Sequence, residues 1–127
     1  MNVVIITGSG GLIGGDTARF FANKGMEVIG VDNDLRRVFF GDEASTKKNH
    51  EALEKELSRY THVDADIRDE KAMSTLFKRH GKNIACIVHA AAQPSHDWAA
   101  SDPHMDFTIN ANGTLNLLEL MRQYSPE

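Results

Sequence analysis

Apolar residues along this chain fall into short continuous runs that alternate with longer segments of helical spacing. Residues 3–7, 27–31 and 84–89 form runs rich in β-branched side chains, and a shorter segment of the same kind lies at residues 62–64. Runs that are apolar on both faces are typical of strands in a parallel sheet with helices on both sides. The pattern therefore predicts four strands over these ranges.

Four helices are expected between and after the strands. The first covers residues 12–23, where Ile13, Thr17, Phe20 and Phe21 share one face. The other three end near Leu57, at His80 and before Ser125, and their predicted N-terminal residues are Ser45 or Thr46, Asp69 and Pro103.

Two details of this pattern can be tested against the structure. The last helix carries a predicted apolar stripe, and Gly113 inside that helix indicates close packing or a kink. The segments between the regular elements, residues 33–41 and 90–94, are predicted to be loops, the first with buried aromatic side chains. The predicted stripe consists of Phe107, Ala111, Thr114, Leu115, Leu118 and Met121.

The alternation of strands and helices predicts an α/β fold with a Rossmann-type, doubly wound parallel sheet. Right-handed crossovers place the strands in the order 3-2-1-4, so the order reverses between the first and fourth strands. A full fold of this type has about six strands, so residues 1–127 are expected to form one dinucleotide-binding domain that is incomplete after the fourth βα unit. The predicted crevice lies between Thr7-Gly8 and His89-Ala90.

A glycine pattern follows the first strand directly. Gly8, Gly11 and Gly14 are spaced as Gly-x-x-Gly-x-x-Gly between a predicted strand and a predicted helix. In this context the glycines permit a tight turn, a close approach to a pyrophosphate, and close packing of helix on strand. Asp32 ends the second strand, near the roughly 20-residue spacing expected for an acid that binds the adenosine ribose. A phosphate-binding loop of the NTPase type is excluded, because no Lys-Ser/Thr follows the glycines.

Composition and charge narrow the possible partners. The net charge is −4 and like charges are not clustered, so nucleic acid and anionic membranes are not expected as partners. No apolar run approaches the roughly 18 residues of a membrane span. The single cysteine, Cys86, and the lack of a basic, cleavable leader suit the cytoplasm. No metal site is predicted, although His62, Asp64 and Asp66 alternate along one strand.

Several motifs together resemble the extended short-chain dehydrogenases, the NAD-dependent nucleotide-sugar epimerases and dehydratases. The segment from Ala92 to Glu119 is most similar to the group of CDP-paratose (CDP-tyvelose) 2-epimerases. The resemblance covers the whole chain. Its motifs are Thr7-Gly8-x-x-Gly11-x-x-Gly14, Asp32-Asn33, Asp66-Ile67-Arg68-Asp69, His89-Ala90-Ala91-Ala92 and Asn110-x-x-Gly113-Thr114-x-Asn116-Leu117-Leu118-Glu119.

This resemblance implies a role for each matching residue in binding NAD. Asp32 would take the adenosine ribose hydroxyls with Asn33 beside it, and Asp66 and Ile67 would border the adenine. Asn110 would order a water and the backbone of the active site, as a supporting residue. Ser95 and His96 would lie near the sugar. The pyrophosphate would contact Gly8, Gly11, Leu12, Ile13 and Gly14, and the nicotinamide ribose would contact Ala90, Ala91, Ala92 and Gln93.

The chain departs from the family in one respect. The catalytic Tyr-x-x-x-Lys motif is absent, since Asp64 stands four residues after Tyr60 and Tyr124 lies too near the end. One interpretation is the NAD-binding portion of a nucleotide-sugar epimerase, inactive by itself. The alternative is a non-catalytic dinucleotide-binding module that acts as a sensor or scaffold.

Two further expectations concern the cofactor and the assembly. The Asp32 carboxylate would repel a 2′-phosphate, which favours NAD over NADP, although Arg36 or Arg37 could accept that phosphate. The fourth strand is expected to be an open, apolar edge beside a partly uncovered last helix. Because such an edge is a template for another chain, we expect a homo-oligomer.

Overall fold

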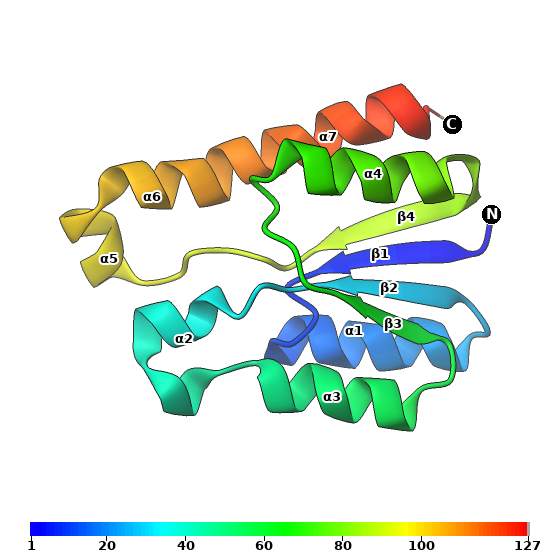
Figure 1. Cartoon of the computed structure of the whole chain (residues 1–127), viewed down its shortest axis with the longest axis horizontal. Coiled ribbons are helices and arrows are strands. Elements are labelled where there is room, and N and C mark those ends of the chain that lie inside the picture. Colours follow the sequence, from blue (N-terminus) through cyan, green and yellow to red (C-terminus); the bar gives the residue numbers. More distant parts are fainter. Residues whose placement is uncertain (127) are drawn as a thin grey trace.

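The four strands form one parallel sheet in the order β3-β2-β1-β4, which confirms the predicted fold and strand order (Figure 1). The computed structural model describes residues 1–126. Strand β1 lies in the middle and pairs with β2 and β4, while β2 also pairs with β3. All carboxyl ends therefore meet at one edge. The strands are β1 (Val3–Thr7), β2 (Glu27–Val31), β3 (Tyr60–Val63) and β4 (Ile84–His89).

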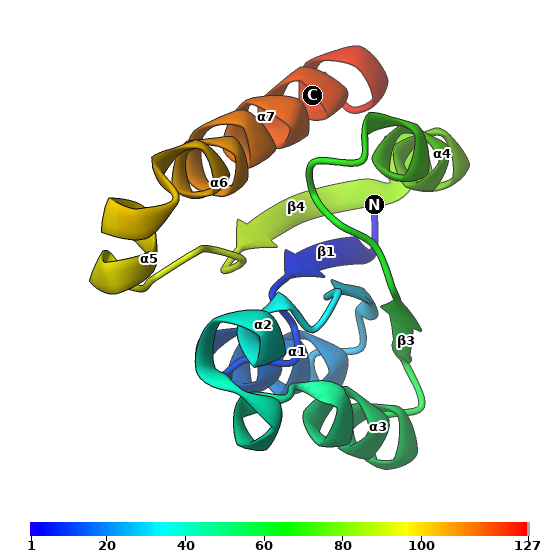
Figure 2. The same cartoon turned by 60° about the vertical axis from the view of Figure 1, so that its left-hand side comes forward.

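Helices cover both faces of this sheet. Helices α1 and α3 lie on one side, and α4 and α7 lie on the other (Figures 1 and 2). The short helices α2, α5 and α6 lie beyond the carboxyl ends of the strands (Figure 1). The bounds are α1 (Leu12–Asn23), α2 (Leu35–Phe40), α3 (Lys47–Glu56), α4 (Glu70–His80), α5 (His96–Ser101), α6 (Pro103–Phe107) and α7 (Gly113–Tyr124).

Alternate side chains of β1 point into two separate cores, as the period of a strand requires. Val3 and Ile5 pack with residues of α4 and α7, and Val4 and Ile6 pack with residues of α1 and α3. Every residue of β1 is buried. The central strand is thus enclosed on both faces, which explains its continuous run of β-branched residues.

Helix α1 has the predicted bounds, but its predicted apolar face is only partly correct, because Phe21 packs against the core and other members of the face do not. Ile13 and Phe20 are largely exposed, and the buried residues are Gly14, Gly15 and Ala18. The reason is the short distance between the helix and the turn after β1. A Cβ added at Gly14 would collide with the carbonyl oxygen of Gly8. At such a close approach only small residues fit, so the large apolar side chains lie outside the contact.

The predicted stripe on the last helix is also displaced. Phe107, Leu115 and Leu118 are exposed, and the side of the helix that faces the core is formed by Ile109, Gly113, Leu117 and Leu120. Between α6 and α7, residues Thr108–Asn112 form a π-helical turn. Because a π turn contains more residues than an α turn, it rotates the helix that follows. The close packing predicted at Gly113 is confirmed, since a Cβ there would collide with the Ile67 side chain.

One short helix replaces a predicted loop segment, and another lies in residues for which no element was predicted. Residues 33–41 contain α2, which starts after Asp34 adopts a left-handed backbone with φ of 59°. Phe39 is buried as predicted, but Phe40 is 46% exposed. Helix α5 was not predicted; the Ser95 hydroxyl caps it by accepting the Trp98 N–H. Strand β3 starts two residues before the prediction, at Tyr60, whose buried hydroxyl donates to Ser9 Oγ.

Strand β4 pairs with β1 alone within residues 1–126, so it is an edge of the sheet, and only Ile84 in it is buried. The sequence predicted this edge. Leu115 and Leu118 on α7 are exposed as well. The homo-oligomer inferred from these surfaces stays a prediction. No helix within residues 1–126 has the length and apolar character that crossing a membrane requires.

The contact at Gly14 gives a first prediction. Gly14→Ala should lower the free energy of unfolding by about 1–3 kcal/mol, the usual effect of overpacking, because the added methyl meets backbone that cannot rotate away. Gly15→Ala is the matched control in the same helix turn. The nearest atoms to a Cβ at Gly15 lie 3.6 and 3.7 Å away, so this change should be neutral or stabilising. Urea denaturation measures both, and equal stability of the two variants would contradict the packing argument.

Two histidine rings stack between α3 and β3. The ring centres of His50 and His62 lie 3.7 Å apart, and the two ring planes are nearly parallel, at 2°. The buried Nδ1 atom of each ring has no hydrogen-bond partner in the described part of the chain. Burial lowers the pKa of His62, the nearby His50 lowers it further, and Asp32, Glu54 and Asp64 oppose this only in part. The neutral ring is therefore favoured in the folded chain.

The lowered pKa of His62 predicts that the folded chain loses stability in acid. The pKa of His62 is lower in the folded chain than in the unfolded chain. As the pH falls, the unfolded chain therefore takes up the proton at a higher pH than the folded chain does. The free energy of unfolding should thus fall as pH drops below about 6.5, the ordinary histidine value. His62→Phe keeps a stacked ring that does not titrate. Urea denaturation from pH 7 to pH 5 should show a shallower decline for this variant, and a decline as steep as in the wild-type chain would contradict the interpretation.

Candidate functional site

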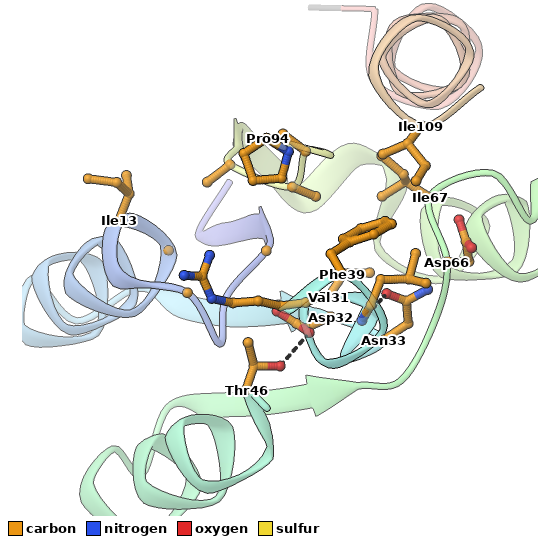
Figure 3. A pocket seen from close by; sticks show the side chains of 18 of the residues that line it. Ile13, Val31, Asp32, Asn33, Phe39, Thr46, Asp66, Ile67, Pro94 and Ile109 are labelled. Carbon is orange, nitrogen blue, oxygen red and sulfur yellow. Dashed lines mark hydrogen bonds between the residues drawn. The ribbon is translucent and has the colours of Figure 1, made fainter. Parts of the chain in front are cut away.

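A cavity of about 310 Å³ opens at the carboxyl ends of the strands (Figure 3). Its walls are the turn after β1, the end of β2, helix α2, and the loops after β3 and β4. All but two of the residues predicted to contact the cofactor line it, and the exceptions are Gln93 and Asn110. The lining residues that the sequence predicted are Gly8, Gly11, Leu12, Ile13, Gly14, Asp32, Asn33, Asp66, Ile67, Ala90, Ala91 and Ala92.

The glycine turn forms the floor of the cavity. Gly8 has a φ of 68° and donates its N–H to the Val31 carbonyl at 2.7 Å. A Cβ at Gly8 would lie 2.7 Å from the Ala91 nitrogen, so the turn and the loop after β4 are in direct contact. Helix α1 begins immediately afterwards, without a side-chain cap or an acid in its first turn. Its unpaired N–H groups and the positive end of its dipole therefore suit an anion.

Asp32 lies at the end of β2, between two chain segments. Its Oδ2 accepts the Gly10 N–H at 3.0 Å, and its Oδ1 accepts the Asp34 N–H and the Thr46 hydroxyl, each at 2.8 Å. The sequence analysis predicted Asp32 but missed Gly10, and it considered Thr46 only as a helix cap. Thr46 does precede α3, but its side chain makes no cap hydrogen bond and is turned toward Asp32 instead (Figure 3).

Asp66 is held by Arg68 rather than free. The guanidinium donates to both carboxylate oxygens, with its shortest contact, from Nη2, at 2.7 Å, and the Arg68 N–H donates at 2.8 Å. Burial alone would raise the pKa of Asp66, but the hydrogen bonds and the charge of Arg68 lower it below its usual range. An adenine amino group at this position would have to share the carboxylate with Arg68, so the predicted role of Asp66 stays a prediction.

A chain of hydrogen bonds joins the ends of β1 and β4 to the last helix. The Thr114 hydroxyl donates to the Asn110 carbonyl at 2.6 Å, so it accepts from Nε2–H of His89 at 3.0 Å. Burial lowers the pKa of His89, and in the neutral ring Nδ1 is an acceptor. Thr7 Oγ1 therefore donates to Nδ1 at 2.6 Å and accepts the Ala91 N–H at 3.2 Å. Each hydrogen bond in this series therefore has a single donor and a single acceptor.

Asn110 acts on the loop after β4 instead of lining the cavity. Its Oδ1 accepts the Gln93 N–H at 2.9 Å, and its Nδ2 donates to the Gln93 carbonyl at 3.0 Å. The buried Gln93 side chain donates to Asp106 at 2.8 Å and accepts the Ser95 N–H. Ser95 and His96, predicted to lie near the substrate, are at the start of α5 and do not line the cavity.

The sequence analysis missed the contribution of α2 to the cavity. Arg36, Phe39 and Phe40 line it, and the Arg36 guanidinium lies 5.0 Å from the centre of the Phe40 ring. The Trp98 indole of α5 donates to the Phe39 carbonyl at 3.1 Å and packs edge-on against the Phe39 ring. The aromatic pair at 39–40 was the available signal, but the sequence indicated only buried aromatic side chains in a loop.

The pairing of Asn110 with Gln93 gives a second stability prediction. Asn110→Ala leaves both backbone groups of a buried loop residue without partners, which should lower the free energy of unfolding by about 1–3 kcal/mol. Asn112→Ala is the control, because Asn112 is exposed in the same π-helical turn, and a change within about 0.5 kcal/mol is expected. Thermal and urea denaturation measure both, and a similar loss in the two variants would point to the helix rather than the loop.

Sequence comparisons agree with this geometry. A family model described as the NAD dependent epimerase/dehydratase family matches residues 4–127. The CDP-paratose 2-epimerase of Salmonella typhi is 33% identical over 122 residues, which cover 96% of this chain and 33% of that protein. The UDP-glucuronate 4-epimerase of Thermodesulfobacterium geofontis is 29% identical, over 98% of this chain and 36% of that protein. The chain thus spans about a third of the length of these curated relatives.

Solved structures show the same likeness. The UDP-glucose 4-epimerase of Bifidobacterium longum, in complex with NAD+ and UDP, is 29% identical with a TM-score of 0.78. The UDP-glucose 4-epimerase of Thermus thermophilus, in complex with NAD, is 30% identical with a TM-score of 0.76. Each alignment covers at least 96% of this chain, but only 34% and 35% of the respective enzyme. The resemblance inferred from the motifs is confirmed: this chain belongs to the NAD-dependent epimerase/dehydratase family.

Proposed function

We propose that the cavity binds NAD in an extended form across the carboxyl ends of the strands. The main support for this proposal is that one cavity is lined by Gly8, the N-terminus of α1 and Asp32. The narrow turn leaves space that a Cβ would fill, and the α1 N-terminus suits a pyrophosphate. The adenosine would lie toward Asp32, Asn33, Asp66 and Ile67, and the nicotinamide ribose toward residues 90–93. Solved relatives in complex with NAD support the proposed cofactor.

We propose further that the chain is the NAD-binding portion of a nucleotide-sugar epimerase. Bound NAD would supply a hydride acceptor and donor, the chemistry on which the known epimerases of this family depend. The chain's own residues would position it, with the loop at 90–95 fixed by Asn110 and Thr7. Ser95 and His96 are the proposed neighbours of the sugar. The likeness to a CDP-paratose 2-epimerase favours a CDP-linked substrate.

The second candidate is a dinucleotide-binding module that acts as a sensor or scaffold. The observation in its favour is the lack of a Tyr-x-x-x-Lys motif in these 127 residues. Both candidates require NAD binding and differ in the chemistry of the intact protein.

With this chain alone, neither should give hydride transfer, so an assay of NADH formation with CDP-linked sugars should show no turnover. Steady turnover by the chain would contradict this proposal.

Titration with NADH and NADPH, followed by the fluorescence of the reduced nicotinamide, tests the cofactor. The wild-type chain should bind NADH more tightly than NADPH. Asp32→Ala should weaken NADH binding by about 1.5–3 kcal/mol, because a hydrogen bond to a charged acceptor is lost, and should weaken NADPH binding less. Asp64→Ala is the matched control, since it removes an exposed acid that lies outside the cavity. Equal losses for the two cofactors in Asp32→Ala would contradict the ribose assignment.

A further inference from the structure

We propose that Thr46 is a positioning residue that fixes the Asp32 carboxylate, leaves it one acceptor site for the ribose, and thereby sets the preference for an unphosphorylated ribose. This inference rests on the proposed binding of NAD. The inference goes beyond NAD binding because it assigns the selectivity for NAD over NADP to Thr46, a residue of a different segment, 14 positions along the chain from Asp32. Figure 3 shows the hydrogen bond between the two side chains beside the cavity.

The acceptor sites of Asp32 are almost all in use. An ionised carboxylate has about four acceptor positions, two on each oxygen. Oδ1 accepts the Asp34 N–H and the Thr46 hydroxyl, and Oδ2 accepts the Gly10 N–H. The one position that remains is on Oδ2. Asp32 therefore has room for one ribose hydroxyl, not for both, and the direction of that remaining lone pair depends on what holds Oδ1.

Thr46 is itself held too firmly to adjust. Its side chain is 3% exposed, and its N–H donates to Asp34 Oδ1 at 2.7 Å. A Cβ at Gly10 would lie 2.6 Å from the Thr46 Cβ, so the glycine turn packs directly against it. The Asn49 amide donates to the Gly10 carbonyl at 2.7 Å and binds the start of α3 to the same turn. The hydroxyl is therefore placed by packing, not by Asp32.

The hydroxyl proton also separates two acids. Thr46 Oγ1 lies 2.8 Å from Asp32 Oδ1 and 3.2 Å from Asp34 Oδ1. Burial alone would raise the pKa of Asp34, but hydrogen bonds from Thr46 and Ser45 lower it, so this acid stays ionised. Without the proton between them, the two carboxylates would repel each other. Only the Gly10 and Asp34 N–H groups would then oppose this repulsion, and we expect the Asp32 carboxylate to turn away from the ribose.

The proposed effect on selectivity follows from charge. A fixed carboxylate at the ribose repels a 2′-phosphate, whereas a carboxylate that has turned away does not. Arg36 lines the same cavity and is exposed, so its guanidinium could then pair with that phosphate. Loss of the Thr46 hydroxyl should therefore weaken the binding of NADH while NADPH is little affected.

The test compares Thr46→Val with Thr46→Ser. Valine keeps the volume and lacks the hydroxyl, and serine keeps the hydroxyl. For Thr46→Val we expect NADH to bind about tenfold more weakly, with NADPH changed less than about twofold. Thr46→Ser should restore the wild-type ratio of the two affinities. Equal losses for both cofactors, or a failure of serine to restore the ratio, would overturn the proposal and indicate a role in folding only.

A second measurement does not depend on any cofactor. Hydrogen exchange of the Gly10 and Asp34 amides reports whether Asp32 still accepts from them. Exchange at both should become faster in Thr46→Val and stay slow in Thr46→Ser, while the Leu53 amide of α3 serves as the control for folding. Thr46→Ala replaces valine if that variant does not fold. Unchanged exchange would overturn the positioning role. Failure of the wild-type chain to bind NADH would overturn the proposed function and with it the selectivity, but not the positioning of Asp32 by Thr46.

Discussion

The contact between Gly14 and the carbonyl oxygen of Gly8 governs the architecture of the site. It sets how closely α1 approaches the turn after β1, and therefore where the first N–H groups of that helix point. The same turn touches the loop after β4 through Gly8 and is tied to the end of β2 through Val31. Three chain segments thus meet at one tight turn. A larger side chain at either glycine would move the helix and open this junction.

The segments around the cavity are joined by polar contacts more than by apolar packing. The two cores lie under and over the sheet, and neither includes Asp32, His89 or Asn110. These three residues instead hold the turn, the loop after β4 and the last helix by hydrogen bonds with specific directions. This division is reasonable physically, because apolar packing fixes the sheet while directional bonds fix the orientation of groups that would contact a ligand.

The sequence predicted the strands, the sheet order and most of the cavity, because those depend on local patterns. β-branched runs identified β1, β2 and β4, and the glycine spacing identified the turn. The buried faces of α1 and α7 were predicted only in part, because they depend on the close approach at Gly14 and on the π turn before Gly113, neither of which follows from helical periodicity. Thr46 was missed as a site residue for a similar reason: its hydroxyl could cap a helix or bind an acid, and only the tertiary contact with Gly10 decides between them.

The contact between Trp98 and Phe39 has a consequence for how the two ends of the cavity depend on each other. Helix α2 follows Asp32, and α5 follows the loop after β4, yet these helices share a hydrogen bond and an aromatic contact outside the sheet. The position of α2, which lines the cavity, therefore depends on α5 as well as on the strands beneath it. A substitution in α5 would alter the wall that α2 forms without touching the cavity, so residues of α2 and α5 are expected to vary together among related chains.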